Sequence, residues 1–330
     1  MIIRRLQLTN FRCHIHKSID FVHRLHVIRG NNGSGKTSCL EAVNLLFNGS
    51  SIAKHCINRK CNTSSIKLSL TNGHIVEWIH NGIRSKVLLN NNPTTHKQIF
   101  SLWPVMFVPS HADSIIRSSN RDRWKRFHSN WLYNNRELYP VLVLLKKLHE
   151  YRQNFLLKQS NQYLNIIEEK IEKLSNVVTS SRLDYLKKIE NQLRSYSEYR
   201  NITIDFYRGW PTGSLSHLLR ACRYSDTGKT TSTYGHHKSG VALLMDDCTP
   251  LSHLLSRGES KRLMHTLYRI QGHLTYSTLG QYVIYLLDDP LAELDYISAD
   301  ILLNKSDSQI ITTDLNSDYD YTIQHSITQL

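Results

Sequence analysis

Hydrophobic and polar positions alternate at the start of the chain, where polar side chains separate Ile2, Leu6 and Leu8. A period of two predicts a strand with one buried face. Residues 25–28 are mostly apolar and lead into a glycine-containing segment, and residues 38–47 after it have the pattern of a helix. We therefore expect strands that are followed by a loop and then by a helix.

Two Asn-Gly pairs, at residues 72–73 and 81–82, enclose the short run 74–80. Turn residues on both sides of a short run predict a β-hairpin. The region up to about residue 110 should therefore be rich in strands, apart from the helix after the loop.

Between residues 111 and 200 the pattern becomes helical. No glycine occurs between Gly82 and Gly209. After Pro140, apolar residues fall near helical spacing as far as residue 156, and the stretch 166–193 combines apolar positions with many Lys and Glu residues. This pattern predicts a pair of amphipathic helices or a small bundle. Glycine and short apolar runs then return, so we expect one α/β domain that is split by a helical insertion.

The charge and the cysteine pattern narrow the class of protein. Lys and Arg number 41 against 27 Asp and Glu, which gives a net charge of +14 and favours a polyanionic partner such as nucleic acid. No apolar run is long enough to span a membrane and no secretory leader is present, so we expect a cytoplasmic protein without a membrane partner.

The 6 cysteines include no C-x-x-C pair, and the 18 histidines form no ligand cluster along the sequence. We therefore expect the cysteines to be reduced thiols, and we expect no metal site formed by cysteines or histidines that are close in sequence.

Residues 30–37 fit the phosphate-loop pattern G-x-x-x-x-G-K-[ST] in full. Glycines let the backbone wrap around phosphates, and the N–H groups at a helix N-terminus attract them. Lys36 is expected to bridge the β- and γ-phosphates of ATP, and the Thr37 hydroxyl to bind Mg²⁺. The residues expected to contact the nucleotide here are Gly30, Asn31, Asn32, Gly33, Ser34, Gly35, Lys36, Thr37 and Ser38.

A second candidate segment is the apolar run 283–287, which ends in Asp288 and Asp289. In a phosphate-loop protein, a carboxylate at the end of a neighbouring strand helps to hold the metal. We expect Asp288 to hold Mg²⁺ together with Thr37, and Asp289 to orient or deprotonate the attacking water. The structural alternative is an acidic turn before Pro290.

Residues 254–264 place a serine and a glycine just before a predicted helix. Ser256 suits the N-cap of that helix, with Glu259 as its capping-box partner. The functional alternative is that the Ser256 hydroxyl and the helix N-terminus cap the γ-phosphate of a nucleotide held by a second copy of the chain. The order of phosphate loop, serine–glycine segment and acidic strand favours this second interpretation.

Together these segments resemble the RecF family of bacterial DNA replication and repair proteins, which belongs to the class of ATP-binding-cassette (ABC) ATPases. The resemblance starts with Asn10-Phe11-Arg12 and extends over essentially the whole chain. The segments that carry it are residues 6–13, 30–37, 105–110, 121–127, 207–211, 235–238, 256–261, 287–295 and 311–313. It implies an α/β fold: an ABC-type P-loop ATPase head, formed by residues 1–110 and 205–330, with an inserted short helical arm at 111–204.

The resemblance also implies roles for further residues. Arg12 would touch the nucleotide, and Ser256 and Gly258 would form a signature that acts on the partner copy. Asp295 would lie at the dimer interface, and Thr312 or Thr313 would sense the γ-phosphate. The implied partners are duplex or gapped DNA, a second copy in an ATP-bound homodimer, and repair mediators of the RecR and RecO type, with a role in recombinase loading and the SOS response to DNA damage.

Several positions depart from the family pattern. Glu259 stands where the family has glutamine, His236 replaces a proline, and Lys238 replaces an arginine. These departures leave two functions open: a weak DNA-stimulated ATPase, or a nucleotide-gated DNA-binding scaffold with negligible hydrolysis. The basic residues Arg121, Arg123, Lys125 and Arg126 are either part of a DNA path or a solvated helix face.

Overall fold

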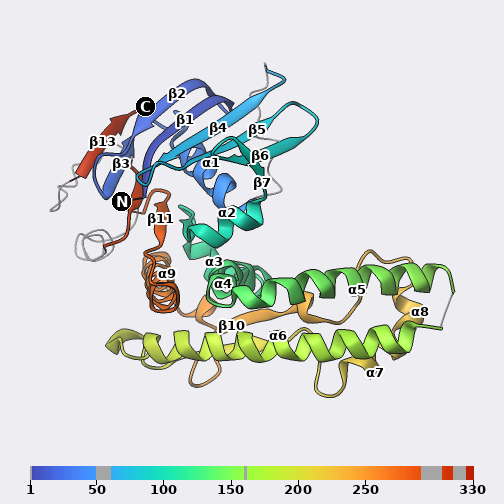
Figure 1. Cartoon of the computed structure of the whole chain (residues 1–330). Helices are drawn as coiled ribbons and strands as arrows, with labels where there is room; N and C mark the ends of the chain where they lie inside the picture. The colour runs from blue at the N-terminus through green and yellow to red at the C-terminus, as the bar shows by residue number, and fades with distance from the viewer. Residues whose placement is uncertain (1, 50–60, 160–161, 291–306, 315–324) are drawn as a thin grey trace. The chain divides into compact units, whose positions relative to one another are not determined.

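The computed structural model describes residues 2–49, 61–159, 162–290, 307–314 and 325–330 (Figure 1). Its contacts divide the chain into two compact units. The head unit comprises Met1–Asp113 and Arg257–Leu330, and the inserted unit comprises Ser114–Ser256. Across the described residues, no helix combines the length and apolar character needed to cross a membrane.

An antiparallel sheet in the head unit has six strands in the order β2-β1-β4-β5-β6-β7. The predicted hairpin is present, because the Asn-Gly pairs join β4 to β5 and β5 to β6. Gly73 and Gly82 have φ values of 83° and 85°, a left-handed conformation that favours glycine. The strands are β1 (Ile3–Phe11), β2 (His14–Asp20), β4 (Ser64–Leu70), β5 (Ile75–His80), β6 (Ser85–Leu89) and β7 (Asn92–Thr94).

The second sheet of the head unit has five parallel strands in the order β13-β3-β12-β11-β8. The predicted strands at 25–28 and 283–287 are its members β3 and β11, and both are buried. Parallel strands end at the same edge of a sheet, so the segments that follow β3, β12 and β11 lie close together. The strands are β3 (Leu25–Arg29), β8 (Val105–Val108), β11 (Ile284–Leu287), β12 (Ile310–Asp314) and β13 (His325–Gln329).

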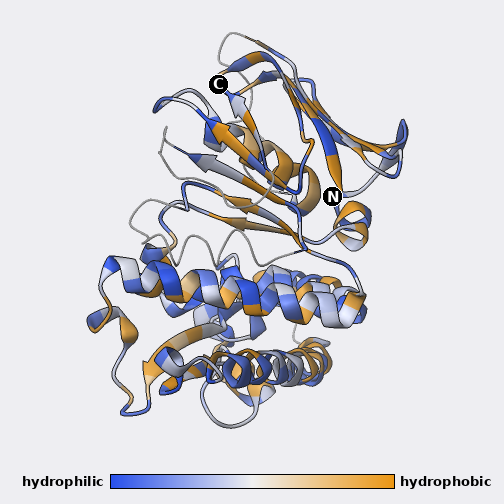
Figure 2. Cartoon of the chain, turned by 90° about the vertical axis from the view of Figure 1, so that its left-hand side faces the viewer, coloured by the Kyte–Doolittle hydropathy of each residue, from blue (hydrophilic) through white to orange (hydrophobic). Residues whose placement is uncertain are grey.

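Helix α1 (Lys36–Asn48) lies between the two sheets and shares one hydrophobic core with both (Figure 1). Its inward residues, such as Leu40 and Phe47, are fully buried, and Figure 2 shows this helix as largely hydrophobic. Helix α2 (His96–Leu102) begins with a capping box at Thr95. Helix α9 (Arg257–Leu279) packs against the parallel sheet, where Gly272 leaves room for the Tyr285 ring because a Cβ there would overlap its hydroxyl.

The inserted unit is built around the long helices α5 and α6, which lie side by side (Figure 1). They match the two predicted helical stretches. A two-stranded antiparallel sheet of β9 and β10 packs with α6 and α4. The elements are α3 (Asp113–Arg117), α4 (Asn120–Asn134), η2 (Arg136–Leu138), α5 (Tyr139–Leu157), α6 (Leu164–Leu193), η3 (Ser197–Tyr199), β9 (Ile202–Tyr207), α7 (Leu215–Ala221), α8 (Arg223–Asp226), η4 (His236–Lys238), β10 (Gly240–Met245) and η5 (Leu251–His253).

The inserted unit is longer than the helical arm expected at 111–204. It continues to Ser256, so residues 205–256 belong to the same compact unit as the helices. The physical reason is that β9 pairs with β10 along its whole length, and α7 packs against α6. The short apolar runs after Gly209 therefore extend the insertion.

A buried ion-pair network ties α5 to this added region. The Arg152 side chain has no exposed surface, and its guanidinium contacts Glu168 at 3.0 Å and Asp226 at 2.8 Å. It also donates to the Leu219 carbonyl at 2.7 Å. Two carboxylates and a carbonyl satisfy the buried cation, which is the condition under which a buried charge is tolerated.

Candidate nucleotide-binding site

The loop between β3 and α1 has the geometry that phosphate binding requires. Helix α1 begins at Lys36, directly after Gly35, whose φ of 99° is left-handed. Gly33 has a φ of 81°, so both glycines have conformations that other residues adopt at a cost. Since Gly35 has no side chain to cap α1, the backbone N–H groups in the first turn of this helix are available to an anion.

Lys36 is held across this loop. Its ammonium donates to the carbonyl of Gly30 at 2.6 Å and to that of Asn31 at 3.0 Å, and the side chain is buried. The charge is therefore fixed beside the backbone that would surround the phosphates. The other predicted loop residues, Asn32, Ser34 and Ser38, lie in the same loop and in the first turn of α1.

Thr37 and Asp288 meet at the edge of the parallel sheet. The Thr37 hydroxyl donates to Asp288 Oδ1 at 2.8 Å, and the Thr313 hydroxyl donates to the same oxygen at 2.9 Å. Asp288 follows β11, and Thr313 lies on the neighbouring strand β12. Hydroxyl and carboxylate oxygens are the protein ligands that Mg²⁺ prefers, so these residues fit the metal of a nucleotide complex.

Asp289 has a different environment from its neighbour. Its backbone is left-handed, with a φ of 47°. Its N–H donates to the Thr313 hydroxyl at 2.8 Å, and its carbonyl accepts from the Lys261 ammonium at 3.0 Å. Burial raises the pKa of the Asp289 carboxyl, and the nearby charge of Lys261 opposes that rise. A raised pKa suits a carboxylate that accepts a proton from water.

Arg12 reaches the site from the turn between β1 and β2. It has a φ of 52°, and its guanidinium contacts the Glu41 carboxylate at 2.8 Å. Burial raises the pKa of Glu41, while Arg12 lowers it. The same turn lies against Gly35, whose carbonyl is 3.1 Å from His14 Nε2.

Sequence analysis did not single out Glu41 or Lys261. A signal for Glu41 was present, because it lies four residues after Thr37 and therefore on the same helical face. Nothing in the sequence predicts the contact of Lys261 with residue 289, which depends on how α9 packs.

The serine–glycine segment lies at the N-terminus of α9. Ser256 directly precedes α9, as an N-cap would, and Gly258 and Glu259 lie in the first turn, with Glu259 exposed. Ser256 belongs to the inserted unit, so its action on a nucleotide stays a prediction. Asp295, expected at a dimer interface, is outside the described residues.

One of the basic residues on α4 is structural. Arg123 is 9% exposed, and its guanidinium donates to the carbonyls of Val241 at 2.8 Å and Ser118 at 2.8 Å. It therefore holds α4 against β10 and is not available to a DNA backbone. Arg121 and Lys125 are exposed and remain candidates.

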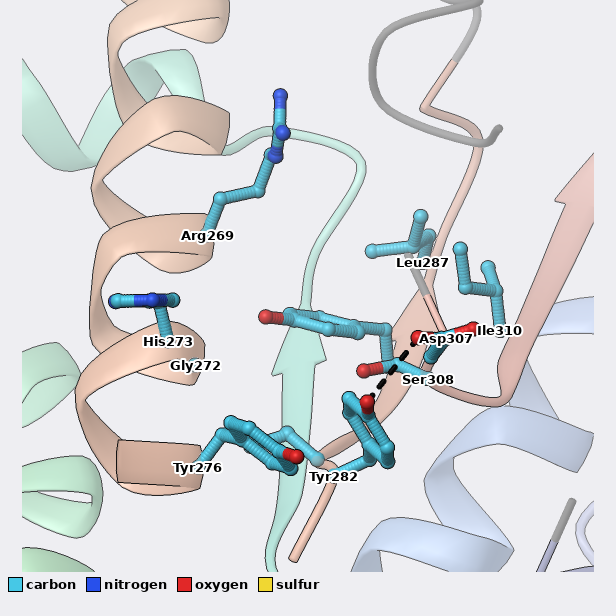
Figure 3. Close-up of a pocket in the computed structure, with 11 residues that line it drawn as sticks. Arg269, Gly272, His273, Tyr276, Tyr282, Leu287, Asp307, Ser308 and Ile310 are labelled. Atoms are coloured by element: carbon cyan, nitrogen blue, oxygen red, sulfur yellow. Dashed lines mark hydrogen bonds between the residues drawn. The ribbon is translucent and has the colours of Figure 1, made fainter. Parts of the chain in front are cut away.

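A cavity of about 330 Å³ lies elsewhere in the head unit, where α9 faces the parallel sheet (Figure 3). Tyr276 and Tyr282 stack with ring centres 4.3 Å apart, and the Tyr282 hydroxyl donates to Asp307 at 3.1 Å. The cavity extends along β11, from Tyr282 before the strand to Leu287 at its end. None of the predicted site residues lines it.

The chain matches a family model described as AAA domain over residues 5–209, more than half of its length. It is 29% identical to the DNA replication and repair protein RecF of Francisella tularensis subsp. tularensis strain WY96-3418, with 96% of both chains covered. The RecF of subsp. novicida strain U112 is also 29% identical, with the same coverage.

Two solved structures of the recombination mediator protein RecF have a similar fold. One, with ATP, has a TM-score of 0.82 at 19% identity and covers 96% of this chain and 94% of its own. The other, with ATPγS, has a TM-score of 0.80 at 17% identity, covering 99% and 95%. An Smc head bound to the C-terminal winged-helix domain of ScpA has a TM-score of 0.54 at 14% identity, covering 97% and 91%. These matches confirm the expected α/β fold of an ABC-type P-loop ATPase head.

Proposed function

The chain belongs to the RecF family of AAA-domain proteins, and on this premise we propose that it is an ATP-driven clamp on DNA that acts in replication and repair. One observation carries the proposal. The ammonium of Lys36 lies across the phosphate loop, and the oxygens of Thr37, Asp288 and Thr313 meet at the same edge of the sheet. This set of groups suits a nucleoside triphosphate and its metal ion.

ATP binding is supported by the relatives, since one of the matching RecF structures holds ATP. In this chain the loop backbone and Lys36 would bind the phosphates, while Thr37 and Asp288 would hold Mg²⁺. The metal would neutralise charge on the phosphate oxygens. Asp289 would accept the proton of the attacking water, which its raised pKa favours.

Dimerisation and DNA binding are the further steps of the proposal. Two copies would enclose ATP between the loop of one and the Ser256–Gly258 segment of the other, and hydrolysis would separate them. The net charge of +14 favours duplex or gapped DNA as the partner, because phosphate contacts dominate affinity that does not depend on sequence. Mediators of the RecR and RecO type would act with the clamp in recombinase loading, in the cytoplasm.

A nucleotide-gated scaffold that does not turn over ATP is the second candidate. The observation that favours it is Glu259, which is exposed in the first turn of α9. A carboxylate at this position would repel the phosphates of a nucleotide bound by the partner copy. The scaffold would share ATP binding, dimerisation and DNA binding with the ATPase and differ only in turnover.

Ser256→Arg tests the trans-acting role. We expect this variant to bind ATP as the unchanged chain does, but to stay monomeric with ATP and to lose ATP-dependent binding to duplex DNA, because the bulky cation blocks the partner's nucleotide. Sedimentation velocity with and without ATP measures the first effect, and fluorescence anisotropy of labelled duplex DNA measures the second. Ser277→Arg is the matched control on an exposed position of the same helix. Full ATP-driven dimerisation of Ser256→Arg would contradict the role.

A further inference from the structure

Three histidines that are distant in sequence meet in the inserted unit. His149 comes from α5, and His236 and His237 come from η4. One ring nitrogen of each lies within 4.8 Å of a ring nitrogen of the other two. Sequence analysis found no ligand cluster among the histidines, and this group corrects that expectation. The sequence could not predict this cluster, because the three rings come together only when η4 packs on α5.

Two of these rings have buried nitrogens that no described residue satisfies. His149 and His236 are each 9% exposed, and neither His149 Nε2 nor His236 Nδ1 has a hydrogen-bond partner within the described part of the chain. A buried polar atom without a partner costs free energy, so most are paired in native proteins. A bound metal ion would satisfy both nitrogens at once.

The remaining nitrogens are oriented as in a ligand set. His237 Nε2 lies 3.1 Å from the Ser232 carbonyl, which can only accept, so this nitrogen carries the proton and Nδ1 keeps its lone pair. His149 Nδ1 lies 3.1 Å from the Ser232 hydroxyl, which leaves Nε2 toward the cluster. Metal-binding histidines are commonly held through their second nitrogen by a carbonyl or another polar group.

Gly235 allows the rings to come this close. Its φ is 143°, and a Cβ on it would lie 3.0 Å from His237 Nδ1 and 3.1 Å from His149 Cε1. Any larger residue would push the two rings apart.

The charges around the cluster are compensated only in part, because Lys238 and Arg121 also act on His237. Arg152 lies nearby, but Glu168 and Asp226 neutralise it. Arg182, which donates to the His236 carbonyl at 2.7 Å and lies over the Trp124 ring, opposes a dication and weakens its binding.

We propose that His149, His236 and His237 form a binding site for a divalent transition-metal ion, with Zn²⁺ as the best fit. Three imidazoles suit zinc, and its tetrahedral coordination leaves one position for water. The ion would fasten η4 to α5.

A zinc titration of the full-length, tag-free protein, first stripped with a chelator, tests the site. Competition with a zinc-responsive dye should show one Zn²⁺ per chain. His236→Pro removes one imidazole, and His149→Gln keeps a polar group beside Ser232; each should weaken binding at least about 10-fold. His217→Ala, on an exposed position of α7, is the matched control and should bind zinc as the unchanged chain does. Circular dichroism confirms that each variant is folded.

X-ray absorption at the zinc edge of the unchanged protein gives a second readout that does not depend on any variant. The site predicts three imidazole nitrogens at about 2.0–2.1 Å from the metal. Absence of stoichiometric zinc, equal zinc affinity of folded His236→Pro and His217→Ala, or a zinc environment without imidazole nitrogens would each overturn the proposal. The nucleotide site lies in the other unit, so loss of zinc binding and loss of ATP binding are separate outcomes.

Discussion

Lys36→Ala is expected to bind ATP at least about 100-fold more weakly than the unchanged chain. The ammonium of Lys36 is buried beside the loop and donates to the Gly30 and Asn31 carbonyls. Each hydrogen bond to a charged group contributes about 1.5–3 kcal/mol, so two contacts to phosphate oxygens account for a loss of this size. Because the proposed dimerisation depends on bound ATP, the variant should also stay monomeric. Isothermal titration with ATP measures the affinity.

Lys86→Ala is the matched control for this experiment. Lys86 lies on an exposed position of β6, so its loss removes the same charge from the head unit without touching the loop. We expect this variant to bind ATP and dimerise normally. ATP-driven dimers of Lys36→Ala at the level of Lys86→Ala would contradict the assignment of the phosphate loop.

Asp289→Asn is expected to lower ATP turnover at least about 100-fold while ATP binding is retained. The amide is close in size to the carboxyl group, so the backbone contacts to Thr313 and Lys261 should persist. It cannot accept a proton from water, and loss of a general base costs typically 10²–10⁴-fold in rate. Steady-state phosphate release, together with ATP affinity by titration, separates the two effects.

Asp184→Asn, on an exposed position of α6, controls for the loss of one negative charge and should leave turnover unchanged. Equal turnover by Asp289→Asn and Asp184→Asn would contradict the role of Asp289. That result would favour the nucleotide-gated scaffold, in which Asp289 takes no part in the residual hydrolysis.

Local patterns predicted the elements that build the nucleotide site. The loop at 30–37 and the acidic strand end at Asp288 follow from short stretches whose residue types leave few alternatives, and the topology of a parallel sheet places both at one edge. The contact between Thr37 and Asp288 is therefore the expected geometry. The sequence could predict it because both segments follow strands of one parallel sheet, although β12 lies between β3 and β11.

Features that depend on packing between distant segments were not predictable in this way. The inserted unit extends to Ser256 because β9 pairs with β10, a register that no local pattern specifies. The basic pattern on α4 gave no sign that Arg123 is buried against backbone carbonyls. The meeting of His149 with His236 likewise arises only when the unit is folded.

Steady-state ATP hydrolysis by the purified protein, with and without duplex DNA, tests whether the chain is a DNA-stimulated ATPase. Lys36→Ala serves as the blank, because it lacks the ammonium that would contact the phosphates. We expect slow turnover above this blank that rises when duplex DNA is added. Turnover no higher than that of Lys36→Ala, with DNA present, would contradict a DNA-stimulated ATPase and leave the nucleotide-gated scaffold as the function.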